Sequence, residues 1–191
     1  EKPLGRSYDE AFSLLHRARQ AGCPVQTAIQ RRHHPSYEWL KRSLIGAGAR
    51  IEEIHAHLHL GFAQTSGGDA SWRSNRQSAG GGALLDAGYH LVDLINYLCG
   101  PFDLVSASLW AGVHLVTERD IDDRAWLTGR SESCWIMLDS WRSGHGHPDT
   151  GLPQKSEGVL LKTSQGLWRA NREGVWHEGQ QLQTMERHWQ R

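Results

Sequence analysis

The sequence has 191 residues, of which 38% are hydrophobic and 22% are charged, so the chain can bury a core and does not have the composition of a disordered protein. Its 21 lysines and arginines balance 21 aspartates and glutamates, which leaves no net positive charge to attract nucleic acid or an anionic membrane. It has neither an apolar run near the ~20 residues of a membrane span nor the order of a signal peptide at its start. We therefore expect a cytoplasmic protein without membrane or nucleic-acid partners, whose three cysteines, with no CxxC spacing, are reduced thiols.

The first part of the chain mixes helical and strand patterns. Ser7 and Glu10 have the spacing of a capping box, and the apolar residues that follow recur on one face of a helix. Farther on, apolar residues alternate with His55, His57 and His59, which predicts a strand with one apolar face. The predicted elements are a helix over 8–21, a short β-prone segment over 24–30, a helix from Pro35 to the glycines at 46 and 48, a strand over 54–60 and a polar loop over 61–81.

The second part of the chain begins with a strongly apolar helix and continues with strands. The helix starts at Gly82 and ends at Gly100-Pro101. Short segments between turn residues then predict strands over 104–113, 125–128, 133–141, 158–162 and 167–170. This order indicates an α+β fold, a mostly antiparallel open β-sheet with helices packed on one face. Residues 1–178 would form this domain, and the polar residues 179–191 would form a tail.

A polar stripe runs along the apolar helix. Asp86, His90, Asp93 and Tyr97 follow one another at i, i+4, i+7 and i+11. A histidine near a carboxylate can exchange a proton with a substrate hydroxyl, although a solvated stripe or a locally bonded histidine is the alternative. The three glycines that precede the helix allow a ligand or another chain segment to approach closely, or they form a simple loop. Near the start of the chain, Pro3 holds Lys2 in an extended backbone state.

Several strings together resemble one family, the Gfo/Idh/MocA oxidoreductases, the group of glucose-fructose oxidoreductase and inositol dehydrogenase. The resemblance covers roughly residues 1–142. It is carried by Glu1-Lys2-Pro3-Leu4, Arg31-Arg32-x-x-Pro35, Trp72-Arg73 and, above all, GGGALLDAGYHLVDLINYLCG over 80–100.

The resemblance implies a catalytic site and a substrate-binding domain. Lys2 would hydrogen-bond the reacting oxygen, His90 would transfer the proton, and Asp86 would orient the substrate or His90. Arg32, Trp72 and Arg73 would be substrate-side candidates. The chain would transfer hydride between a nicotinamide cofactor and a sugar, polyol or related cyclic alcohol, in a homo-oligomer formed through the open sheet.

The cofactor, NAD or NADP, would be bound by an N-terminal Rossmann domain that normally ends at the EKP string, so we expect that domain to be absent from this sequence. The Gly46-Ala47-Gly48-Ala49 string lies between a predicted helix and a predicted strand, the reverse of the order that cradles a pyrophosphate. We interpret it as a turn. The expected absence of the cofactor domain leaves open a non-catalytic dimerising module derived from the same family.

Two residue types leave further alternatives open. The clustered histidines could serve a metal-dependent hydrolase, but we expect no metal and interpret His55, His57 and His59 as a polar sheet face, because neither a carboxylate nor a cysteine stands beside them at ligand spacing. Trp110, Trp126, Trp135 and Trp141 fall on predicted strands. We interpret them as core or interface residues rather than as a stacking surface for a sugar ring.

Overall fold

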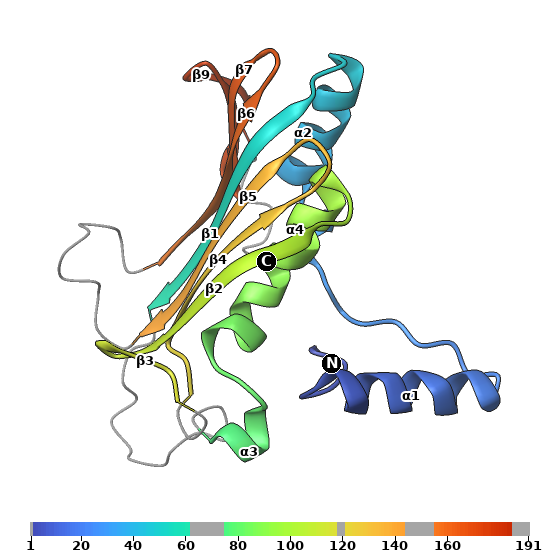
Figure 1. The fold of residues 1–191 in the computed structure, drawn as a ribbon. Coiled ribbons are helices and arrows are strands. Elements are labelled where there is room, and N and C mark those ends of the chain that lie inside the picture. Colours follow the sequence, from blue (N-terminus) through green and yellow to red (C-terminus); the bar gives the residue numbers. More distant parts are fainter. Residues whose placement is uncertain (1, 62–74, 118–120, 144–154, 185–191) are drawn as a thin grey trace.

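The computed structural model describes residues 2–61, 75–117, 121–143 and 155–184. A nine-stranded open sheet dominates it, with the strand order β3-β2-β4-β5-β1-β6-β7-β8-β9 (Figure 1). Only the β1–β5 pair is parallel among the pairs of this sheet. The predicted α+β fold with a mostly antiparallel open sheet is confirmed.

Each strand that the sequence predicts overlaps one strand of the structure, namely β1, β2, β4, β5, β6 and β7. The bounds are β1 Ile51–Gly61, β2 Asp103–Ala111, β3 His114–Leu115, β4 Arg124–Arg130, β5 Trp135–Ser143, β6 Lys155–Thr163, β7 Gly166–Asn171, β8 Gly174–His177 and β9 Gln180–Thr184. Three short strands, β3, β8 and β9, were not predicted from the sequence.

The helices begin and end where their capping residues indicate. Ser7 accepts a hydrogen bond from the backbone N–H of Glu10 at 3.2 Å, and Pro35 stands in the first turn of its helix. The bounds are α1 Tyr8–Gln20, η1 Arg31–His33, α2 Pro35–Gly46, α3 Arg76–Ala79, η3 Leu84–Gly88 and α4 Tyr89–Cys99. None of the helices in the described part of the chain is long and apolar enough to cross a membrane.

The core lies between one face of the sheet and the helices α2 and α4. The β1 side chains of Ile54, Ala56 and Leu58 are fully buried there. Leu94 and Ile95 of α4 pack in the same cluster. No residue of α1 is buried, and Figure 1 shows α1 lying away from the sheet at the end of an extended segment.

The opposite face of the sheet carries no described helix (Figure 1). Trp126 and Trp135 on this face are 49% and 52% exposed, whereas Trp141 is only 7% exposed. Trp141 lies on the same face as Trp135, because the two residues are an even number of positions apart on β5, and its ring centroid is 5.8 Å from that of His59. Of the residues interpreted as core or interface, Trp141 is buried, and Trp126 and Trp135 are exposed, which leaves the interface alternative for these two.

Two further predictions differ from the structure. Residues 24–30 form no strand, because they connect α1 to η1 and pair with no strand of the sheet. Within the predicted tail, Gln180–Thr184 forms β9, since Glu178 and Gly179 adopt positive φ angles of 48° and 79° that turn the chain back onto β8. The rest of that tail, 185–191, lies outside the described residues.

Candidate functional site

The triple glycine at the start of the apolar helix meets another segment of the chain. A Cβ atom on Gly82 would stand 1.7 Å from the backbone oxygen of Asp122, so only glycine fits there. The buried Asp122 carboxylate accepts the N–H groups of Gly82 and Leu84, each at 2.7 Å. The close approach thus serves to cap the helix start, one of the two purposes that the sequence left open.

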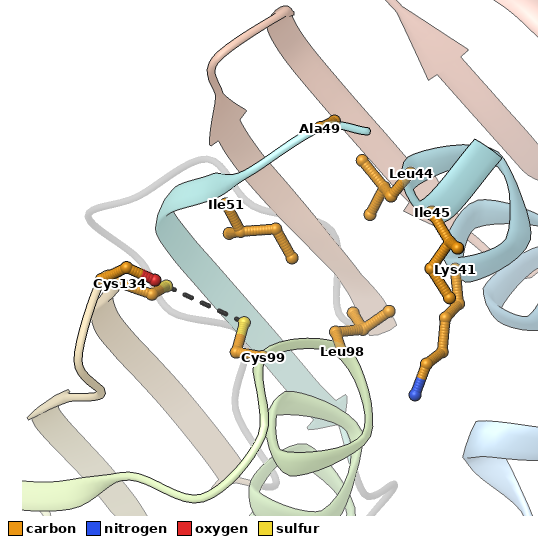
Figure 2. A pocket seen from close by; sticks show the side chains of 9 residues that line it. Lys41, Leu44, Ile45, Ala49, Ile51, Leu98, Cys99 and Cys134 are labelled. Carbon is orange, nitrogen blue, oxygen red and sulfur yellow. Dashed lines mark hydrogen bonds between the residues drawn. The ribbon is translucent and has the colours of Figure 1, made fainter. Parts of the chain in front are cut away.

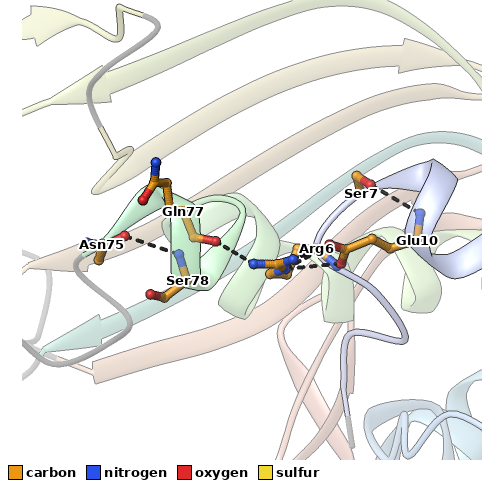
Figure 3. A network of polar contacts seen from close by, with 6 residues as sticks. All are labelled: Arg6, Ser7, Glu10, Asn75, Gln77 and Ser78. Atoms are coloured by element: carbon orange, nitrogen blue, oxygen red, sulfur yellow. Dashed lines mark hydrogen bonds and ion pairs between the residues drawn. The ribbon is translucent and has the colours of Figure 1, made fainter.

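Gly80 accommodates the N-terminal segment in the same way. A Cβ atom there would stand 2.5 Å from the backbone oxygen of Arg6. Arg6 in turn donates to the backbone oxygen of Gln77 at 2.6 Å and pairs with Glu10 (Figure 3). These contacts fix the N-terminal segment beside the start of the helix, so that Lys2 reaches a residue 84 positions farther along the chain.

That residue is Asp86, and it lies between two cations. The Lys2 ammonium donates to Asp86 Oδ1 at 2.7 Å and to its backbone oxygen at 2.6 Å. The Arg142 guanidinium, from β5, donates to Asp86 Oδ2 at 2.9 Å. Burial alone would raise the pKa of Asp86, but its hydrogen bonds and charge interactions with Lys2 and Arg142 outweigh burial and lower it. Asp86 is therefore a carboxylate that holds Lys2 in place.

His90 lies four residues farther along, next to Tyr89. The chain between Asp86 and His90 passes through the π-helical turn η3, a deviation that is frequent at functional sites. Tyr89 Oη lies 3.0 Å from His90 Nε2. The Tyr89 ring centroid lies 4.1 Å from that of His90 and 5.2 Å from the Lys2 ammonium. The tyrosine ring thus connects the ammonium to the imidazole.

The His90 imidazole is neutral at neutral pH. Its side chain is buried, and burial, followed by the positive charges of Arg31 and Lys2, lowers its pKa to about 3. This pKa lies well below the ordinary histidine value of about 6.5. Nδ1 of His90 is buried and has no hydrogen-bond partner among the described residues, which leaves it available to a bound group.

The structure separates the two arginines of the Arg31-Arg32 string. Arg32 donates from Nε to Asp93 Oδ2 at 2.8 Å, so this substrate-side candidate is engaged by α4, the helix of His90. Arg31 is 8% exposed and pairs with Glu157 of β6, which also pairs with Arg172. The positive charge of Arg31 is one of the causes that lower the pKa of His90. Trp72 and Arg73 lie outside the described residues.

Sequence reasoning identified Lys2, Asp86 and His90, and the structure brings these three residues together. It missed Arg142 and Glu157, which reach the site from strands whose sequence shows no catalytic pattern. Tyr89 stands within the quoted helix string, and its place beside a histidine was the available signal. Among these three, only Tyr89 could have been proposed from local sequence.

The histidine cluster on β1 lies on the face of the sheet away from the helices. His59 is 3% exposed, and its Nε2 lies 3.0 Å from Asp139 Oδ2 while its Nδ1 lies 3.1 Å from Ser156 Oγ. The sequence around His59 offers no carboxylate at ligand spacing, and the structure supplies Asp139 from the neighbouring strand β5. Across the described ranges, no three or more His, Cys, Asp or Glu side chains are grouped to hold a metal ion.

The Gly46-Ala47-Gly48-Ala49 string does not have the geometry that cradles the pyrophosphate of a dinucleotide. Ala47 and Gly48 follow α2 and precede β1, and Gly48 has a φ of 62°. The string is a helix-to-strand turn, as predicted, and presents no helix N-terminus to a phosphate.

The open, mostly antiparallel sheet with helices on one face is the fold of Gfo/Idh/MocA dehydrogenase domains. The sequence profile of the GFO/IDH/MocA C-terminal domain matches residues 39–151. The chain belongs to this family, which is a family of enzymes that includes NADH-binding dehydrogenases.

Individual relatives agree with this assignment. Levoglucosan dehydrogenase of Pseudarthrobacter phenanthrenivorans is 29% identical over 110 residues, 57% of this chain and 28% of that protein. A solved levoglucosan dehydrogenase complex with NADH and levoglucosan has a TM-score of 0.74 at 22% identity, covering 91% of this chain and 48% of that one. The WlbA dehydrogenase of Bordetella pertussis with NADH and UDP-GlcNAcA has a TM-score of 0.74 at 19% identity, covering 98% and 51%. The chain thus spans about half the length of these solved relatives, and the structural likeness shows the fold.

Proposed function

We propose that this chain is the substrate-binding part of an NAD(P)-dependent dehydrogenase that oxidises a hydroxyl group of a sugar, polyol or related cyclic alcohol. The observation that carries the proposal is the convergence of the Lys2 ammonium, the Asp86 carboxylate and the His90 imidazole on the start of one helix. The Lys2 ammonium can hydrogen-bond the oxygen of an alcohol, and the His90 imidazole can accept the proton of the same alcohol.

Each residue has a distinct part in this chemistry. Lys2, held by Asp86, would donate a hydrogen bond to the substrate oxygen, which gains negative charge as its proton leaves. The neutral His90 would accept that proton, and the positive charges that lower its pKa would return it readily in the reverse direction. Arg142 holds the second oxygen of Asp86, so the carboxylate keeps Lys2 in position. When bound, the nicotinamide ring would accept the hydride from the same carbon.

The ligands of similar structures and the residues of the site together support a sugar-like substrate. The similar structures hold levoglucosan and a UDP-linked sugar acid, both of which are cyclic and rich in hydroxyl groups. Arg32, Trp72 and Arg73 remain candidates for contacts to the rest of such a substrate. The dinucleotide would be held outside the described residues, and the greater length of the solved relatives leaves room for a nucleotide-binding part.

The test measures reduction of NAD⁺ and NADP⁺ by the protein that contains this chain, with glucose, galactose, levoglucosan and inositol as substrates. We expect turnover with at least one of them, a loss of roughly 100-fold in kcat for His90→Ala and a comparable loss for Lys2→Met. His33→Ala, at an exposed histidine, should leave the rate unchanged.

Unchanged turnover in His90→Ala would remove His90 from the mechanism. A folded protein that reduces neither cofactor with any of these alcohols would favour the second candidate, a non-catalytic dimerising module. That candidate is supported by the exposed aromatic side chains on the open face of the sheet, among them Trp126 and Trp135.

A further inference from the structure

Two cysteines from separate elements face each other at one end of the core. Cys99 is the last residue of α4, and Cys134 immediately precedes β5. Their sulfur atoms lie 3.8 Å apart (Figure 2). A disulfide has an S–S distance of about 2.05 Å, so the sulfurs need to approach by somewhat less than 2 Å. Both cysteines stand at the ends of elements, Cys99 at the end of α4 and Cys134 just before β5.

The sulfur atoms line a cavity that small molecules can enter. The cavity has a volume of about 170 Å³, and its walls include Leu44, Ile51 and Leu98 besides the two cysteines. Because one water molecule occupies about 30 Å³ in the liquid, this space admits a molecule as small as a peroxide. Cys134 is buried and Cys99 is partly exposed, and both residues line this cavity, which gives an oxidant a space beside the pair.

The two thiols of the pair differ in acidity. The hydrogen bond with Cys99 lowers the pKa of Cys134, whereas the same hydrogen bond and burial raise the pKa of Cys99. The Lys41 ammonium, which donates to the backbone oxygen of Tyr97, also lines the cavity and adds a positive charge. A thiolate is the form that attacks a peroxide, and a neighbouring thiol can then resolve the product.

We propose that Cys99 and Cys134 form a reversible disulfide when the protein meets a peroxide. Cys134 attacks one peroxide oxygen, the O–O bond breaks, and water leaves with formation of a sulfenic acid. Cys99 then attacks the Cys134 sulfur, and a second water leaves as the S–S bond forms. Two thiols are thereby oxidised by two electrons, and one hydrogen peroxide is reduced to two waters.

The bond would change how α4 is held. This helix begins with Tyr89 and His90 and ends at Cys99, so the disulfide would fasten its C-terminal end to the start of β5. It would close a loop that contains β2 and β4, which constrains the unfolded chain. We expect oxidation to raise Tm by roughly 5–10 °C. This inference does not depend on the proposed function.

The experiment treats the full chain with hydrogen peroxide under native conditions and follows it by intact mass and by peptide mapping without reductant. We expect a loss of about 2 Da per chain, the mass of two hydrogen atoms, and one cross-linked peptide pair that joins Cys99 to Cys134. Dithiothreitol should restore the original mass. The wild-type peptide map gives this answer without any variant, so it does not depend on whether a substitution folds.

Matched variants locate the bond. Cys23→Ser, at an exposed cysteine outside the pair, should keep the mass loss and the rise in Tm, whereas Cys99→Ser and Cys134→Ala should lose both. The proposal is overturned if peroxide adds oxygen to either sulfur without a cross-link. It is equally overturned if the disulfide that forms includes Cys23 or joins two chains.

Discussion

The His90 side chain is 6% exposed, and its pKa of about 3 has a consequence for stability. In the unfolded chain a histidine binds a proton below about pH 6.5, whereas folded His90 stays neutral down to about pH 3. Between these values the unfolded state holds more protons, so falling pH destabilises the fold by up to about 1.4 kcal/mol per pH unit. Asp86, whose pKa is lowered in the folded state, affects the stability of the fold over a lower pH range. Its contribution to stability is present above about pH 4 and is lost as the pH falls below that value.

We therefore predict that His90→Gln reduces the acid sensitivity of the fold. Glutamine keeps a polar side chain and takes up no proton, so the loss of unfolding free energy between pH 7 and pH 4.5 should be smaller than in the wild type. His33→Gln, at an exposed position, should keep the wild-type slope. Urea denaturation at several pH values measures the difference, and parallel profiles for His90→Gln and the wild type would contradict the burial argument.

The sequence alone predicts some residues of the candidate site and not others. Lys2, Asp86 and His90 were found because they stand in short strings of recognisable residues. Arg142 was not, because its role follows from strand β5 ending beside Asp86, and only the tertiary structure brings these two residues together. The pKa of His90 also escaped prediction, since it depends on burial and on the charge of Arg31 from another element.

At the scale of elements, the helix start at the site depends on glycine. Gly82 lets the Asp122 backbone approach, and Asp122 caps the N–H groups of Gly82 and Leu84. The sequence predicted α1 and α2 well because caps and prolines are local signals, but it missed the short α3, which lies within the predicted loop over 61–81. It missed β9, a strand of Gln, Leu and Thr at the sheet edge, because no alternation of apolar residues distinguishes that strand from a tail.

Gly82→Ala should therefore destabilise the fold. The new methyl group would lie against backbone atoms of Asp122, which cannot rotate away as a flexible side chain could. We expect a loss of roughly 2–4 kcal/mol in unfolding free energy, or roughly 5–15 °C in Tm. Gly46→Ala is the matched control, since a Cβ there meets nothing within 4 Å and the residue ends α2. That variant should be neutral or slightly stabilised, and equal Tm values for the two variants would contradict the close-approach argument.

At the scale of the whole molecule, the two faces of the sheet differ in what covers them. Helices α2 and α4 bury one face, while the other presents Trp126, Trp135 and Leu160 at 49%, 52% and 47% exposure. Large exposed apolar side chains that gather on one surface indicate a contact with another molecule. The open face supports the proposal, made first from the family resemblance, that two copies of the chain pair through their sheets.

The double variant Trp126→Glu with Trp135→Glu tests this pairing. Wild-type chain should have the mass of a homo-oligomer in light scattering, and the variant should dissociate at least about 30-fold more readily, because buried tryptophans contribute about 2 kcal/mol or more to interfaces. Both side chains are half exposed in the single chain, so the substitutions leave the core intact. Ile45→Glu, at an exposed residue of α2 on the helical side, should keep the oligomer. A wild type that is monomeric at high concentration would contradict the pairing itself. A double variant that stays associated would place the contact elsewhere, because new carboxylates cannot be buried in an interface without a large desolvation cost.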